Sequence, residues 1–156
     1  MDYKIEGLDP RRFEYLWGRD DAGLAAHRAR RLRVDSEPGF PDRISLRDAP
    51  LNASIILVNY EHMAVHSPYR SSHAIFVLEG CVERFSRVGE IPPCLLGRSL
   101  SVRAFDHEAM MVTAELVEGP SLDSCLKDIF RSKHVSHVDI HFAGAGCFFA
   151  RATGVR

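Results

Sequence analysis

The stretch HVDIHF at residues 137–142, followed by AGAGC at 143–147, carries both a strand pattern and a group of reactive side chains. Apolar and polar residues alternate along it, which is typical of a half-buried β-strand. The glycines after it predict a turn, so we expect a closing β-hairpin. The apolar face holds Val138, Ile140 and Phe142, and the polar face holds His137, Asp139 and His141.

The length of the turn decides which residues of the hairpin face one another. A turn of two or four residues sets Phe142 opposite Cys147, whereas a three-residue turn over 143–145 sets His141 opposite Cys147. The three-residue register also keeps Arg151 on the polar face and the neighbouring alanines on the apolar face. We therefore predict this register, with imidazole and thiol about 4.5–5.5 Å apart at Cβ.

The polar face of the hairpin allows three interpretations. In the first, His141 activates a Cys147 thiolate and Asp139 orients the imidazole, so these three are the candidate catalytic residues of an enzyme or a small-molecule-binding protein. In the second, His137, Asp139 and His141 bind a divalent metal, although alternate residues of a strand lie about 6.5–7 Å apart and all three would strain to share one ion. In the third, the face is polar and hydrated, and its side chains only hydrogen-bond and pair with Arg151.

A second group of candidates follows the apolar run SIILVNY at 54–60, which predicts a buried central strand ending there. Loops at strand ends often contact ligands. Arg70 would clamp a carboxylate or phosphate, and Tyr69 would stack on a flat ligand. Alternatively, Glu61 or Glu79 pairs with Arg70 and only fixes the loop. The predicted ligand-binding residues are Tyr60, Glu61, Ser67, Tyr69, Arg70 and Arg103. His62, His66 and His73 share no clean face, so we assign no metal site to them.

The composition is that of an ordinary globular chain. At 156 residues with a net charge of −1, we expect one domain over residues 1–156 and no nucleic-acid partner. No apolar run approaches the roughly 20 residues that span a bilayer, so no membrane partner is expected. The start MDYK resembles no secretory signal, and four cysteines form no CxxC pair, so we predict a cytoplasmic protein with reduced thiols. No cofactor is predicted, the partner is a small molecule with an anionic group at Arg70, and a homo-oligomer stays open.

The remaining patterns predict an α+β domain with a largely antiparallel mixed sheet, two N-terminal helices and one C-terminal helix before the hairpin. Asp9 and Pro10 form a helix start, and a second helix runs over 21–30. The basic residues at 27–33 close that helix, either as a solvated face or as a phosphate contact. The third helix covers 122–131, with its apolar residues on one face. Strands are predicted at 3–7, 43–46, 54–60, 74–79, 99–106, 110–117, 136–142 and 147–152.

Several short motifs occur in a fixed order along nearly the whole chain. They are RISLRDA at 43–49, NYEH at 59–62, SPYR at 67–70, AIFV at 74–77, LSVRAFD at 100–106 and GCF at 146–148. Together they resemble a bacterial family of domains of unknown function, numbered 1203. The resemblance implies a small, single-domain bacterial protein without an assigned activity, so no catalytic role is carried over.

The last strand of that family reads His-x-His-Asn before the Gly-Cys. This chain matches the pattern at His141, Gly146 and Cys147. It departs from it at Asp139, where the family has histidine, and at Phe142, where the family has asparagine. The departures weaken a shared three-ligand metal site and leave the His141–Cys147 pair intact.

Overall fold

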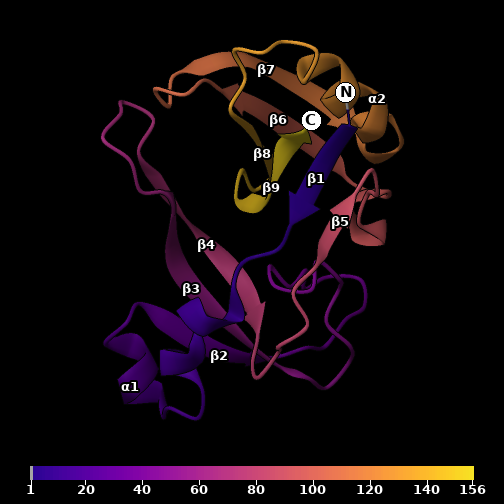
Figure 1. The fold of residues 1–156 in the computed structure, drawn as a ribbon. Coiled ribbons are helices and arrows are strands. Elements are labelled where there is room, and N and C mark those ends of the chain that lie inside the picture. Colours follow the sequence, from indigo (N-terminus) through magenta and orange to yellow (C-terminus); the bar gives the residue numbers. More distant parts are fainter. Residues whose placement is uncertain (1) are drawn as a thin grey trace.

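Two antiparallel sheets form the protein in the computed structural model, which describes residues 2–156. The six-stranded sheet has the order β5-β1-β9-β8-β6-β7, and the three-stranded sheet has the order β2-β3-β4 (Figure 1). This confirms a single α+β domain with antiparallel pairing. The strands are β1 Asp2–Glu6, β2 Ala29–Arg33, β3 Ser54–Met63, β4 Ser71–Leu78, β5 Ser86–Val88, β6 Ser99–Phe105, β7 Met111–Glu118, β8 His137–Phe142 and β9 Phe148–Val155. The helices are α1 Asp21–Ala25 and α2 Leu122–Ile129.

The larger hydrophobic core lies between α2 and one face of the six-stranded sheet. The alternation of β8 buries Val138 and Ile140 in this core, where they share a cluster with Leu122 and Leu126 of α2. A second core forms where the N-terminal segment packs on the three-stranded sheet. The opposite, polar face of the six-stranded sheet is thereby left to meet the end of the three-stranded sheet.

The N-terminal helices differ from the prediction. The segment after Asp9 forms two short 3₁₀ turns, although the Asp9 carboxylate still caps the first by accepting from Arg11 N at 3.0 Å. The second predicted helix, 21–30, is reduced to the five residues of α1. Arg28 has a φ of 54°, which ends helical geometry, and the basic residues after it form β2 instead.

Pairing between segments distant in the sequence explains this change. Residues 29–33 satisfy their backbone groups against β3, a stronger constraint than the weak helical pattern of 21–30. By contrast, α2 is confirmed, because its apolar stripe is long and regular. Of the described residues 2–156, none belong to a helix both long enough and apolar enough to cross a membrane.

Two further strand predictions are corrected. Residues 43–46 form a turn, because the Asp42 carboxylate accepts from Ile44 N at 3.2 Å and from Ser45 N at 2.7 Å. The central strand does not end at Tyr60 but continues as β3 to Met63. This extension carries the end of β3 to the polar face of the six-stranded sheet.

The closing hairpin has a four-residue turn rather than the predicted three. Phe142 N donates to Cys147 O at 3.0 Å, and Phe148 lies opposite His141. A β-bulge follows, so that Asp139 nevertheless pairs with Arg151. The polar and apolar faces are therefore as predicted at the open end of the hairpin but not next to the turn, where Cys147 lies opposite Phe142, and Phe148 and Phe149 exchange faces. Phe149 enters the core, and Phe148 lies on the polar face.

A buried arginine in the 41–46 turn joins the two sheets. Arg43 is 1% exposed, and its guanidinium donates to Pro41 O at 2.6 Å and to Phe148 O at 2.9 Å. The rings of Phe142 and Phe149 lie 5.2 and 5.5 Å from its central carbon, within cation–π range. Burial lowers the pKa of Arg43 to about 10, so the group stays charged at neutral pH.

We expect Arg43→Ala to lower the free energy of unfolding by roughly 3–5 kcal/mol, because two buried carbonyl oxygens would lose their donor and a void would remain. Urea denaturation measures this. The matched control is Arg87→Ala, since Arg87 is exposed on β5, and its effect should stay within about 0.5 kcal/mol. Equal losses in the two variants would contradict a structural role for Arg43.

Candidate functional site

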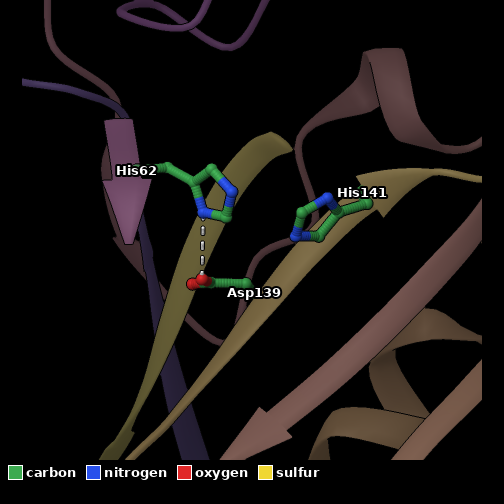
Figure 2. Close-up of side chains that lie close together, drawn as sticks. All are labelled: His62, Asp139 and His141. Atoms are coloured by element: carbon green, nitrogen blue, oxygen red, sulfur yellow. Dashed lines mark ion pairs between the residues drawn. The ribbon is translucent and has the colours of Figure 1, made fainter. Parts of the chain in front are cut away.

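Three polar side chains converge between the two sheets. His62 comes from β3, and Asp139 and His141 come from the polar face of β8 (Figure 2). One ring nitrogen of each histidine and one carboxylate oxygen lie within 4.8 Å of one another. The convergence depends on the length of β3, because His62 is the residue before its last.

His141 presents a neutral imidazole with a free lone pair. Its Nδ1 lies 2.9 Å from Gly146 O, and because a carbonyl oxygen can only accept, Nδ1 carries the proton. The other nitrogen, Nε2, is buried and has no hydrogen-bond partner among residues 2–156. Burial lowers the pKa of His141 to about 4, although the Gly146 bond opposes the shift. Nε2 is therefore available to bind an electrophile or a proton donor.

His62 is held on both sides of its ring. The side chain is 3% exposed and stacks between Phe148 and His73, each at a centroid distance of 4.8 Å. Ser71 Oγ lies 3.0 Å from Nε2, and a hydroxyl can accept from that nitrogen. Nδ1 lies 3.5 Å from Asp139 Oδ2, which is long for a hydrogen bond. Metal binding through Nδ1 would require the tautomer in which Nε2 carries the proton and donates it to Ser71 Oγ, in place of any contact from an Nδ1 proton to Asp139.

Asp139 supplies a fixed negative charge. It is fully buried, and Arg151 donates to it through Nε at 2.7 Å and Nη2 at 2.9 Å. Burial on its own would raise the pKa of this carboxyl group, but the contacts with His62 and Arg151 outweigh it and lower the pKa to about 2. The carboxylate is therefore ionised at any physiological pH.

This set of two imidazoles and one carboxylate suits a divalent transition metal. Zinc sites with open positions use three protein ligands of these types, and iron(II) sites use two histidines and a carboxylate. Metal-binding histidines usually donate their other ring nitrogen to a neighbouring acceptor, which fixes the ring. Gly146 O is such an acceptor for His141, and Ser71 Oγ suits the same role for His62.

The structure brings Cys147 to a different partner from the one predicted. Its Sγ lies 3.2 Å from Arg43 Nη2 and accepts from it. His141 uses one nitrogen for Gly146 and turns the other toward His62, so the predicted contact between imidazole and thiol is wrong. The catalytic roles of Cys147, His141 and Asp139 stay predictions.

The other residue of the predicted metal set, His137, lies further along β8. Its ring stacks on Phe105 at 5.3 Å, and burial lowers its pKa. Arg103 pairs with Asp139 across the ladder, but its Nε donates to Ser101 Oγ at 3.1 Å. Neither His137 nor Arg103 belongs to the group of convergent ligand atoms found in residues 2–156.

The predicted ligand-binding loop forms the turn of the β3–β4 hairpin. Arg70 Nε lies 2.6 Å from Glu61 Oε1, the ion pair that the structural alternative proposed. Tyr69 packs edge-on against Phe105 at 5.7 Å, and Ser67 Oγ donates to Ala109 O at 2.8 Å. The loop therefore reaches the β6–β7 turn. Tyr60 lies apart from these residues and faces the N-terminal segment, and a ligand at this loop stays a prediction.

Sequence reasoning considered His62 and His73 but assigned no metal site to them, and it missed Ser71. Continuing the alternation of the central strand past Tyr60 would have placed His62 on the same face as Ile56 and Val58. That signal was present in the sequence. The sequence held no signal for the contact between β3 and β8, because that contact depends on how the two sheets pack.

Comparison with known proteins gives one family. Residues 39–153 match the model of a family described as protein of unknown function (DUF1203), which confirms the resemblance seen in the sequence. Neither curated proteins nor solved structures yield a match. The matched range includes all three convergent residues.

The Asp139–Arg151 pair should respond asymmetrically to substitution. In chelator-treated protein, we expect Arg151→Met to cost roughly 3–5 kcal/mol of unfolding free energy, because the buried carboxylate loses its countercharge. Asp139→Asn should cost about 1–2 kcal/mol, since Arg151 can be hydrated. Urea denaturation of both variants and the double variant measures the coupling. A larger loss for Asp139→Asn would contradict this account.

Proposed function

We propose that this chain, which belongs to the DUF1203 family, binds a divalent first-row transition metal through His62, Asp139 and His141. The description of the family assigns no activity, so the proposal is drawn from the convergent side chains. Four buried imidazole nitrogens lack hydrogen-bond partners within residues 2–156, and the observation that carries the proposal is that two of them, on His62 and His141, lie beside an ionised carboxylate. Buried polar atoms of this kind are rare unless they bind something.

The electrostatics of the site favour a cation. Asp139 is charged, and burial keeps His141 neutral, so the set offers one negative charge and lone-pair donors. Arg151 occupies both carboxylate oxygens, yet each oxygen has a second lone pair that a metal can use. Three protein ligands leave one or more coordination positions for water or a substrate.

The thiol chemistry drawn from the sequence is less well supported. Cys147 would need His141 as its base, and both nitrogens of that ring are directed elsewhere. The metal set drawn from the sequence keeps Asp139 and His141 and exchanges His137 for His62. A cytoplasmic location, a bacterial source and a homo-oligomer stay predictions.

Metal titration tests the proposal. We expect one equivalent of Co²⁺ to give visible absorption bands that Zn²⁺ abolishes, and chelator competition to give the Zn²⁺ affinity. His62→Ala and His141→Ala should each weaken Zn²⁺ binding by at least about 100-fold, because a ligand is lost. His62→Gln serves as a second variant, and circular dichroism checks that all variants fold.

Two control histidines sharpen the result. His134→Ala removes an exposed histidine and should leave Zn²⁺ affinity within about threefold of the parent. His137→Ala distinguishes the ligand set predicted from the sequence, which includes His137, from the set proposed here, which has His62 instead. This variant should also leave the Zn²⁺ affinity unchanged. A protein that binds neither ion, or one whose affinity depends on His137 and not on His62, would overturn the proposed site.

A further inference from the structure

A cavity of about 220 Å³ adjoins the convergent residues on the side facing the N-terminal segment. His62, Phe148 and Arg151 form part of its wall, so it reaches the inner site directly. The remaining walls include Arg12 from the first 3₁₀ turn, Tyr60 from β3 and Arg84 from the segment before β5. A small molecule in this cavity would lie against the open side of the proposed metal.

The guanidinium groups of Arg12 and Arg84 each use only one N–H group in a hydrogen bond among residues 2–156. Arg12 Nη1 donates to Tyr60 Oη at 2.6 Å, and among the described residues no carboxylate lies within ion-pair distance of Arg12. Arg84 Nε donates to Gly7 O at 2.7 Å, which leaves the terminal nitrogens outside that hydrogen bond. Arg12 is anchored by one hydrogen bond, and Arg84 by one hydrogen bond and a 4.0 Å ion pair with Glu6, so both keep further N–H groups for a ligand.

The two carboxylates of the cavity wall are already neutralised by residues other than Arg12. Asp9 is held by Arg11 Nη2 at 2.6 Å, and the bonds from Arg11 lower the pKa of Asp9 to about 2. Glu6 lies 2.9 Å from Lys4 Nζ but 4.0 Å from Arg84 Nη2. The cavity therefore keeps a positive surplus at its outer wall.

We propose that this cavity binds a small organic or inorganic oxyanion, a carboxylate or a phosphate, through Arg12 and Arg84. The planar guanidinium fork matches the oxygens of both groups. At the inner end of the cavity the proposal rests on the proposed function. There a second donor atom of the ligand would coordinate the metal held by His62. Leu8 and Phe148 add apolar wall for a short carbon body.

Calorimetric titration with inorganic phosphate and with succinate tests the proposal, in metal-free and in Zn²⁺-loaded protein. We expect Arg12→Gln and Arg84→Gln each to weaken binding about tenfold, because a charge-assisted contact is lost. Arg87→Gln removes the same charge from exposed β5 and should leave binding unchanged. Zn²⁺ loading should strengthen binding in the parent protein.

The two proposals fail in different ways. If phosphate and succinate bind to neither form, or bind equally well to Arg12→Gln and Arg84→Gln, the oxyanion site is overturned even when Zn²⁺ binds normally. If Zn²⁺ does not bind but the two arginine variants still weaken anion binding, the metal site is overturned and the oxyanion site is supported. Zn²⁺ affinity in both arginine variants should match the parent.

Discussion

The buried guanidinium of Arg43 is the contact on which the arrangement of the two sheets depends. Its backbone N–H donates to Phe76 O of β4 at 3.1 Å, and its carbonyl accepts from Leu8 N at 2.7 Å. Its side chain reaches Phe148 O at the start of β9. One residue thus links the three-stranded sheet, the exit of β1 and the closing hairpin. Because Phe148 stacks on His62, the same contact sets the ring of His62 against β8. Burial disfavours this charge even with its partners in place, as its lowered pKa indicates, and the loss of a partner would add to that cost.

The hairpin shows how a wrong turn length can leave the faces of a strand correct. The sequence favoured a three-residue turn because it kept Arg151 on the polar face and the alanines in the core. The actual four-residue turn would reverse those faces, but the bulge adds one residue to β9 and restores them at Asp139. Binary pattern constrains only the parity of the register. It therefore predicted the face shared by Asp139 and Arg151, and it failed for residues 147–149, between the turn and the bulge, where the partner of His141 is decided.

Local signals predicted α2 and most strands, and they failed where distant segments compete for the chain. The basic run after Arg28 reads as the end of a helix, yet it pairs with β3. Residues 43–46 read as a strand, yet the Asp42 carboxylate folds them into a turn. The candidate site divides in the same way. Asp139 and His141 follow from one strand pattern, whereas His62 is 77 positions before Asp139 and joins them only through sheet packing.

Asp139 explains how one site can serve both stability and binding. Arg151 balances its charge in the folded protein, so the carboxylate can be buried without a bound ion. His141 remains an uncharged lone-pair donor, because burial lowers its pKa to about 4. A metal would then enter a preformed set rather than one that assembles around it, because each ring is already held from its far side by Ser71 or Gly146. Arg151 holds the buried carboxylate and also lines the cavity, together with Arg12 and Arg84. An oxyanion in this cavity would therefore have a third guanidinium in its wall, one whose charge Asp139 already balances.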